Sequence, residues 1–302
     1  MNQITAKLSR TLALSTLGLA ALAGSAQAQI FVANGFNTDA YNFDGTLQTS
    51  SLITGSTAQF NVTVANNLIY VTQQGATSGA GSVGVYKLDG TPVNANLITG
   101  LYNSLSVAVS GGYIYVGDAN TGTIGQYNLD GTVVNNSLIT GLSVPTGLIV
   151  AGGHIYVADE GLNSVGEYNL DGTAVNLVVN GATGGAIYNL ASDGTDLFVT
   201  DIGLGTVGEY GLDGTVINDA LVSGLNGPSG VAVFDGNLYV GVNYDAKVAE
   251  YATDGTLING SLITTGLGNI QGIYVVPEPS VSVLALVAGG LFLVVRRRAA
   301  RA

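Results

Sequence analysis

The chain has 302 residues, no cysteine, no tryptophan and a single histidine, and its formal net charge is −12. Without cysteine it can form neither a disulfide scaffold nor a thiolate metal site, and one histidine excludes sites built from two or three imidazoles. Glycine and proline are too few for low-complexity disorder, and 47% hydrophobic residues at this length suffice for a large core.

Residues 1–28 are predicted to be a secretory signal peptide. Lys7 and Arg10 provide the positive start, and a Leu- and Ala-rich apolar run follows them. Ala26 and Ala28 then give the small-x-small pattern of a signal peptidase cleavage site. We interpret the segment as an export signal rather than a buried N-terminal helix, because these three parts occur together and in order.

Residues 29–276 consist of one repeat that recurs along the chain. Each repeat contains four short β-prone runs separated by Gly, Asn and Asp turns, and the period is near 41 residues. The tripeptide Asp-Gly-Thr marks the repeats, beginning at Asp44, Asp89, Asp130, Asp171, Asp213 and Asp254. Four strands in such a period are typical of a β-propeller blade, whereas helical repeats need a 3.6-residue periodicity that no run shows. The predicted fold class is therefore all-β.

The two ends of this region predict how the ring closes. Residues 272–276 align with the innermost strand of a repeat, and residues 30–34 align with the second strand. The runs around Tyr41 and Leu52 follow as the third and fourth strands. One C-terminal strand and three N-terminal strands then complete a sixth four-stranded blade and pair sheet edges that would otherwise stay open. We predict a six-bladed β-propeller.

Two runs carry a resemblance to a known repeat family. Gly230 to Val240 contains Gly-Val-Ala-Val and Gly-Asn-Leu-Tyr-Val, and Ile155 to Asp159 reads Ile-Tyr-Val-Ala-Asp. These runs resemble NHL-type propeller repeats, and the resemblance covers nearly all of residues 29–276. It implies a propeller fold that serves many functions, including RNA binding in relatives with basic repeats.

The charge of this region argues against nucleic acid. Residues 29–276 contain two lysines, no arginine and 19 acidic residues, a formal net charge of −17. Such a body repels nucleic acid and anionic lipid surfaces, so neither is an expected partner.

Two repeated features are interpreted as structural. Asp-Gly-Thr is expected to form the hairpin between the third and fourth strands rather than a calcium loop, because no Asp-x-Asp-x-Asp spacing accompanies it. The aromatic residue of each second strand is expected in the core. Sugar stacking is the alternative role for these aromatic residues, which are Phe31, Tyr70, Tyr115, Tyr156, Phe198 and Tyr239.

The repeated polar residues are also interpreted as non-catalytic. Asp118, Asp159 and Asp201 end successive second strands, but packed sheets lie about 10 Å apart, too far for these carboxylates to share one ion. We expect each to cap its own loop and to make that face acidic. His154 occupies a position that other repeats fill with different residues, so it is not predicted to be a catalytic base. Solvated positions are expected for the third-strand residues Gln126, Glu167, Glu209 and Glu250.

Residues 277–302 are predicted to be a sorting signal. A Pro-Glu-Pro tripeptide precedes an apolar run of fifteen residues, which as a helix would cover only about 22 Å of the roughly 30 Å hydrocarbon layer. An arginine cluster follows this run, and the signal residues are Pro277, Glu278, Pro279, Arg296, Arg297 and Arg298. This order resembles the PEP-CTERM sorting signal.

That resemblance implies recognition by an exosortase at the inner membrane of a Gram-negative bacterium, removal of the tail, and delivery to the cell surface or an exopolysaccharide matrix. An ordinary C-terminal membrane anchor with one transmembrane helix is the alternative.

We therefore expect an exported binding or structural module whose partner is a glycan or a surface protein. Signal peptidase and exosortase would process it, and only the tail would contact the membrane. No catalytic, cofactor-binding or metal-ligating residue is predicted, and any calcium binding is expected to be weak. A propeller whose acidic face stores or senses calcium is one alternative. The other is a metal-dependent lactonase- or lyase-like enzyme, with ligands from the inner-strand loops near Asn103, Asn189, Asn226 and Asn269.

Overall fold

The computed structural model describes residues 29–276 except residues 56, 76, 78 and 182, and Gln29–Val276 form one compact unit. Residues 1–28 and 277–302 lie outside the described part. The predicted cleavage and sorting residues therefore lie outside it too, namely Ala26, Ala28, Pro277, Glu278, Pro279, Arg296, Arg297 and Arg298.

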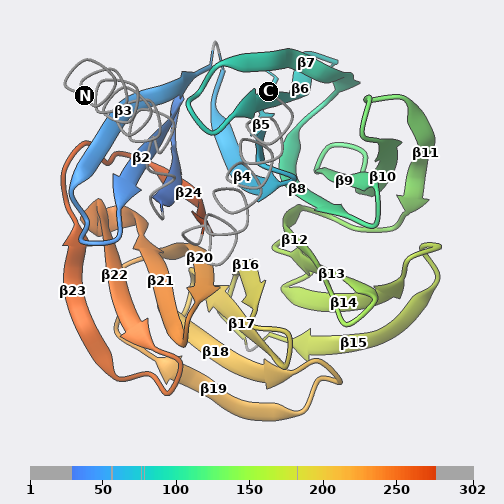
Figure 1. Ribbon diagram of the computed structural model, residues 1–302. Helices are drawn as coiled ribbons and strands as arrows, with labels where there is room; N and C mark the ends of the chain where they lie inside the picture. The colour runs from blue at the N-terminus through green and yellow to red at the C-terminus, as the bar shows by residue number, and fades with distance from the viewer. Residues whose placement is uncertain (1–28, 56, 76, 78, 182, 277–302) are drawn as a thin grey trace, which may run out of the picture. The chain divides into compact units, whose positions relative to one another are not determined.

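Six antiparallel sheets of four strands each surround a common axis (Figure 1). The first sheet consists of β4 (Gln59–Ala65), β5 (Leu68–Gln73), β6 (Gly81–Lys87) and β7 (Pro92–Leu101). The second consists of β8 (Ser104–Ser110), β9 (Tyr113–Asp118), β10 (Thr123–Asn128) and β11 (Val133–Ile139). The third consists of β12 (Pro145–Ala151), β13 (His154–Asp159), β14 (Ser164–Asn169) and β15 (Ala174–Asn180).

The remaining sheets follow the same plan. The fourth consists of β16 (Ile187–Ser192), β17 (Asp196–Asp201), β18 (Thr206–Gly211) and β19 (Val216–Val222). The fifth consists of β20 (Pro228–Phe234), β21 (Asn237–Val242), β22 (Lys247–Ala252) and β23 (Leu257–Ile263). The sixth consists of β24 (Ile270–Val276), β1 (Gln29–Asn34), β2 (Asn37–Asn42) and β3 (Leu47–Thr54). The first-named strand of each sheet packs against those of both neighbouring sheets, so these six strands surround the axis. The predicted six-bladed β-propeller is confirmed.

The sixth sheet closes the ring as the sequence predicted. Strand β1 pairs antiparallel with β24, with Phe31 opposite Tyr274 and Val32 opposite Ile273. The other edge of β1 pairs with β2, which in turn pairs with β3. Backbone hydrogen bonds between the two ends of the compact unit therefore hold the ring together.

The antiparallel order gives the ring two distinct faces. The turns that join first to second strands and third to fourth strands emerge on one face, which we call the hairpin face. The opposite face, which we call the connection face, carries the loops after the second strands and the links between sheets.

The core lies between the sheets, and the second-strand aromatic residues fill it. Tyr156 packs with Ile187 and Val199 of the next sheet. A fully buried side chain of this size contributes about 1.5–3 kcal/mol. The predicted core position is confirmed for the whole set, which is at most 2% exposed: Phe31, Tyr70, Tyr115, Tyr156, Phe198 and Tyr239.

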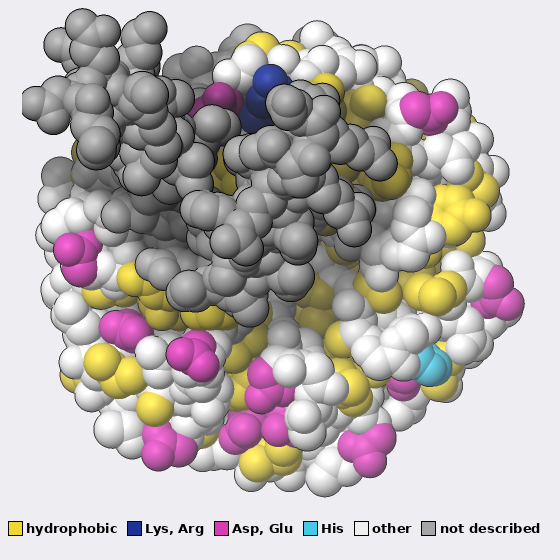
Figure 2. Space-filling model, viewed as in Figure 1, with side chains coloured by type: hydrophobic (Ala, Val, Ile, Leu, Met, Phe, Trp, Pro, Cys, Tyr) yellow, Lys and Arg dark blue, Asp and Glu magenta, His cyan; other side chains and the backbone are white. Residues whose placement is uncertain are grey.

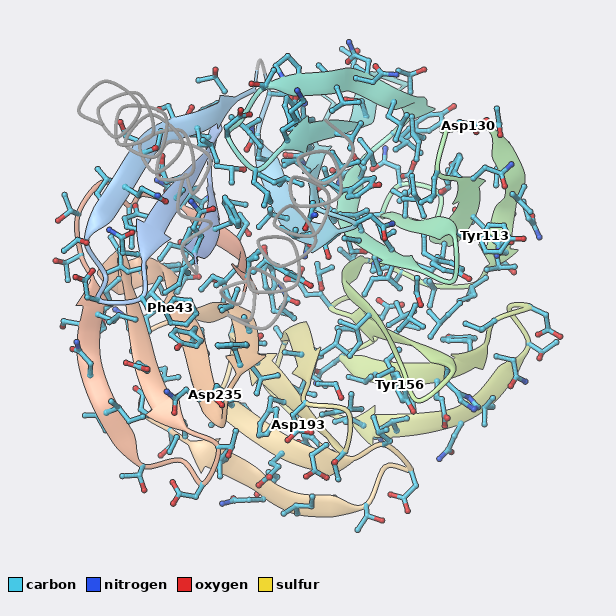
Figure 3. All side chains as sticks on the ribbon, viewed as in Figure 1. Phe43, Tyr113, Asp130, Tyr156, Asp193 and Asp235 are labelled. Carbon is cyan, nitrogen blue, oxygen red and sulfur yellow. The ribbon has the colours of Figure 1, made fainter. Side chains whose placement is uncertain are left out.

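The Asp-Gly-Thr tripeptides form the hairpins between third and fourth strands, as predicted. The Oδ1 atom of Asp130, which Figure 3 places toward the rim, accepts hydrogen bonds from the Thr132 backbone N–H (2.9 Å) and hydroxyl (2.6 Å). Gly131 has a φ of +86°, which glycine adopts without the steric penalty of a side chain. A Cβ on Gly131 would also overlap the Leu97 carbonyl oxygen of the preceding sheet. The turn therefore joins neighbouring sheets as well as neighbouring strands.

Helical structure is minimal in the part of the chain that the structure describes. The one helical element there is a 3₁₀ turn, η1 (Asn243–Asp245). No helix among the described residues is long and apolar enough to cross a membrane. The apolar run of the predicted sorting signal lies outside them.

Candidate functional site

The three aspartates that end second strands bridge two loops each. Asp159 accepts backbone hydrogen bonds from Ser143 (2.7 Å) and Val144 (2.8 Å) in the link before its sheet, and from Leu162 (3.1 Å) in its own loop. Asp118 and Asp201 are held in the same way. The predicted loop capping is confirmed.

These aspartates present little carboxylate surface on the connection face. Asp159 is only 1% exposed, and Asp118 and Asp201 are also buried, because the loops that they cap fold over them. Among the described residues, no group of three or more His, Cys, Asp or Glu side chains is arranged to hold a metal ion.

The third-strand glutamates are less solvated than expected. Glu167 is 8% exposed, and its Oε1 lies 3.4 Å from the Tyr156 hydroxyl, which also donates to the Leu212 carbonyl of the next sheet (3.1 Å). In the second sheet the Gln126 amide donates to the Tyr115 hydroxyl (3.3 Å), and Gln126 is buried as well. A buried tyrosine hydroxyl needs a polar partner, and the third strand supplies it.

His154 belongs to the same structural pattern. Its Nδ1 atom lies 3.0 Å from Glu167 Oε1. In the fifth sheet Asn237 occupies the equivalent position, and its amide donates to Glu250 Oε1 (2.9 Å). The histidine lies on the periphery of the face seen in Figure 2, where it is coloured cyan, and it does not line the axial cavity described next.

A cavity of about 430 Å³ lies on the axis of the ring. Residues from all six inner strands line it, namely those of β4, β8, β12, β16, β20 and β24. Most of its lining residues carry aliphatic side chains, such as Val62, Leu148 and Leu190, but polar atoms make up more of the exposed wall than apolar atoms do. The hydroxyl of Tyr274, which also lines it, is hydrogen-bonded to Thr63, and burial raises the pKa of this tyrosine. The volume of the cavity falls within the range of about 300–1,000 Å³ that small-molecule sites occupy.

Two asparagines break the repeat at this cavity. The third residue of an inner strand is glycine in three sheets and Ser106 in a fourth, but it is Asn61 in β4 and Asn189 in β16. These two strands lie on opposite sides of the ring, and both asparagines line the cavity.

Both asparagines are largely buried and keep hydrogen-bonding capacity. Asn189 is 6% exposed; its Oδ1 accepts from the Leu190 backbone N–H (2.8 Å), but its Nδ2 bonds to no described residue. The side-chain amide of Asn61 also bonds to no described residue, although its backbone N–H donates to Thr72. Among the described residues, the unbonded amide atoms of these two asparagines are not fully buried, so they face the open cavity, where water or a ligand can bond to them.

The β16–β17 hairpin breaks the repeat at the mouth of the cavity. It has three residues, 193–195, whereas the other four hairpins that leave an inner strand have two. Asp193 is exposed and lines the cavity together with Gly194, so the cavity reaches the hairpin face here (Figure 3). Its Oδ1 accepts from the Thr195 and Asp196 backbone N–H groups, which leaves Oδ2 without a partner among the described residues.

Negative charge gathers beside this mouth. Burial and then the Asp193 carboxylate raise the pKa of Asp196, and burial followed by Asp196 and Asp193 raises the pKa of Glu209. Figure 2 shows acidic side chains grouped over this sheet, in addition to those around the rim. The mouth therefore favours a neutral or positively charged ligand over an anion.

Toward the connection face, where the inner strands begin, a hydrogen bond links two inner strands that are not neighbours. The Tyr188 hydroxyl on β16 donates to Gln271 Oε1 on β24, although β20 lies between these two strands. Both side chains are buried, and neither lines the cavity. Burial, and after it the Glu160 carboxylate, raises the pKa of Tyr188, which therefore stays protonated and able to donate.

Of the four asparagines predicted near the axis, the structure places one at the cavity. Asn189 lines it, whereas the others serve the connection face. Asn103 donates its backbone N–H to Asp118, Asn226 donates to Asp245, and the Asn269 carbonyl accepts from Gly35. Sequence reasoning missed Asn61 and Asp193. Both could have been found from departures from the repeat. Asn61 stands where three other sheets have glycine, and Asp193 lies in a hairpin that has one extra residue.

Comparisons with known proteins support the fold. No family model and no curated protein matches the sequence. A chain from the crystal structure of a nidogen/laminin complex gives a TM-score of 0.70 at 17% identity, covering 82% of this chain and 98% of that one. A protein of unknown function from Bacteroides caccae gives 0.65 at 14% identity, covering 84% and 100%.

An enzyme is also similar to this chain. A catalytically inactive histidine variant of virginiamycin B lyase from Staphylococcus aureus, solved with quinupristin, gives a TM-score of 0.56 at 18% identity, covering 69% and 71%. At such identities the likeness concerns the β-propeller fold and not the activity.

Proposed function

We propose that this protein is an exported, non-catalytic binding module of the cell surface or exopolysaccharide matrix, with its ligand site in the axial cavity. One observation carries the proposal. The repeated aspartates, such as Asp130 and Asp159, are engaged in structural hydrogen bonds, whereas the polar residues that break the repeat line the cavity with unused hydrogen-bonding atoms. These residues are Asn61, Asn189 and Asp193. Small-molecule sites use such a small number of placed polar groups to fix the orientation of a ligand and to select it.

Export is the part of this proposal that depends on the two ends of the chain. The signal pattern before Gln29 and the Pro-Glu-Pro tail support it, together with the acidic body, which suits a soluble surface protein. The structurally similar nidogen chain was solved in a complex with laminin, so a propeller of this shape can serve as a binding module.

Mass spectrometry of the protein from cells of an exosortase-bearing Gram-negative host tests the export. The surface fraction should contain a form that begins at Gln29 and lacks the arginine cluster. A Glu278→Ala variant should keep the tail and stay in the inner-membrane fraction. A released wild-type form that still carries Arg296–Arg298 would contradict the proposal.

A metal-dependent lactonase- or lyase-like enzyme is the second candidate. The observation in its favour is that Asn61 of the first sheet and Asn189 and Asp193 of the fourth sheet form an asymmetric set of oxygen-bearing side chains. Metal analysis and calorimetry with Ca²⁺ separate the two functions. We expect only shallow uptake that disappears near physiological ionic strength, because diffuse attraction to the acidic body is screened by salt. A stoichiometric, salt-resistant site with micromolar affinity would favour the enzyme.

A further inference from the structure

The unused hydrogen-bonding atoms of the axial cavity restrict the chemistry of its ligand. Asn189 Nδ2 needs an acceptor, whereas Asp193 Oδ2 needs a donor, and the Asn61 amide offers both. A hydroxyl group can serve each of these, since it carries one donor and two acceptor sites. The wall exposes both polar and apolar atoms, which suits a ligand that carries several hydroxyls on a C–H framework.

The negative charge at the mouth of the cavity restricts the class of ligand further. Asp193 lies at the mouth, with Asp196 and Glu209 beside it, and no lysine or arginine side chain among the described residues lines the cavity. A carboxylated, sulfated or phosphorylated ligand would meet repulsion there without a compensating cation. A neutral ligand meets none, and an ammonium group would be attracted to the Asp193 carboxylate.

The shape of the channel determines which part of a polymer can enter. The mouth is on the hairpin face, and the buried side chains of Tyr188 and Gln271, which are bonded to each other near the connection face, do not line the cavity. We therefore expect a chain to enter by its end from the hairpin face rather than to thread through the ring. The volume of about 430 Å³ limits the bound portion to a small-molecule size.

We propose that the axial cavity binds the terminal sugars of a neutral or amino-sugar glycan, which enter from the hairpin face. The amides of Asn61 and Asn189 bind sugar hydroxyls inside the cavity, and Asp193 binds a hydroxyl or ammonium group at the mouth. This inference rests on the proposed binding function and names its ligand class.

Calorimetry on the full chain, in a zwitterionic detergent without a sugar headgroup, tests the ligand class. The probes are cellotriose, a glucosamine trimer, a trigalacturonate and spermidine. We expect the glucosamine trimer to bind most tightly, cellotriose next, and trigalacturonate at least about tenfold more weakly than cellotriose. Spermidine binding that Asn189→Ala weakens, without binding of either uncharged or amino sugar, would overturn the proposal.

Substitutions locate the site. Asn189→Ala and Asn61→Ala should each weaken glucosamine-trimer binding about tenfold, the usual effect of one lost hydrogen bond. Asn96→Ala is the matched control, because this exposed asparagine lies on the outer strand β7 and its side chain bonds to no described residue. Equal effects of Asn96→Ala and Asn189→Ala would exclude the axial cavity as the site.

A substitution at the exposed residue Asp193 tests the site without disturbing the folded core. Asp193→Asn retains the Oδ1 acceptor of its turn and removes the charge, so it should reduce the preference for the glucosamine trimer over cellotriose severalfold. An unchanged preference would overturn the role of Asp193. Absence of sugar binding in a protein that reaches the cell surface would refute this inference alone, whereas failure to reach the surface would refute the proposed function.

Discussion

The Asp-Gly-Thr hairpins at the rim and the cavity on the axis differ in how closely they follow the repeat. All six hairpins place their glycine at a φ between +81° and +86° and bond their aspartate to the threonine N–H. Around the axis, the third inner-strand residue varies among Gly, Ser and Asn, and one hairpin is longer.

This difference separates stability from recognition. A position that every sheet fills in the same way meets a requirement that every sheet shares, namely closure of its turn and contact with its neighbour. A position that varies between sheets is free of that requirement and can adapt to a ligand. Substitutions at the rim should therefore lower stability and leave binding intact, and substitutions at the axis should do the reverse.

Deletion of residues 272–276 should have the largest effect on the stability of the ring. It removes most of β24, so β1 loses a paired edge and β4 and β20 lose an inner neighbour. We expect the cooperative thermal transition to be lost in circular dichroism. Deletion from Pro279 onward is the control and should leave the transition unchanged. If both truncations melted alike, ring closure by β24 would not be required for stability.

Gly172→Ala tests the contact between an Asp-Gly-Thr hairpin and the outer strand of the preceding sheet. Its φ is +86°, and a Cβ would overlap the Leu138 carbonyl oxygen, so we expect a loss of about 2–4 kcal/mol. Gly141→Ala is matched for backbone conformation, with a φ of +83° but open space around the Cβ, and should lose only about 1–2 kcal/mol. Urea unfolding measures both. Equal losses would mean that the contact with Leu138 contributes nothing.

Asp159→Ala and Asp171→Ala compare a buried with an exposed repeated aspartate. Asp159 satisfies three backbone N–H groups under folded-over loops, so its removal should lower the free energy of unfolding by about 2–4 kcal/mol. Asp171 bonds to Thr173 at the fully exposed surface, so its removal should lower the free energy of unfolding by clearly less than the removal of Asp159. Chemical denaturation of the two variants checks this order, and the reverse order would contradict the capping role.

The fold was predictable because each of its determinants is local and occurs six times. Asp130-Gly131-Thr132 specifies a turn by itself, and the run from Ile155 to Asp159 specifies a strand, so the period and the two ends sufficed to place the sheets.

The candidate site was less predictable, because it depends on which residues of distant repeats face the same space. Asn61 and Asn189 are 128 residues apart in the chain, and only the ring brings them to one cavity. The burial of Glu167 was missed for a related reason, since it depends on side chains that lie on the neighbouring strand, Tyr156 among them.

One cross-strand position shows how far a single sheet can depart from the repeat without losing the fold. It pairs His154 with Glu167 in the third sheet and Asn237 with Glu250 in the fifth. These residues lie diagonally across two strands and are not directly opposite each other. In the fourth sheet the same diagonal joins two carboxylates, because Asp196 lies opposite Gly211 and Glu209 lies two residues before Gly211. Burial, and after it a neighbouring carboxylate, raises the pKa of both.

Asp196→Asn should give the smallest change, a stabilisation of about 0.2–1 kcal/mol at pH 7, because it copies the amide–carboxylate pair of the fifth sheet. In the unsubstituted protein the pKa of Asp196 is raised by folding. The protonated carboxyl therefore gives its full stability below the unfolded pKa, and this stability is lost as the pH rises through the folded pKa. The stabilisation should therefore be present at pH 7 and disappear near pH 3. Asn237→Asp should destabilise by a similar amount at pH 7. Urea unfolding at both pH values measures each variant, and a pH-independent gain for Asp196→Asn would show that repulsion between the two carboxylates is not its cause.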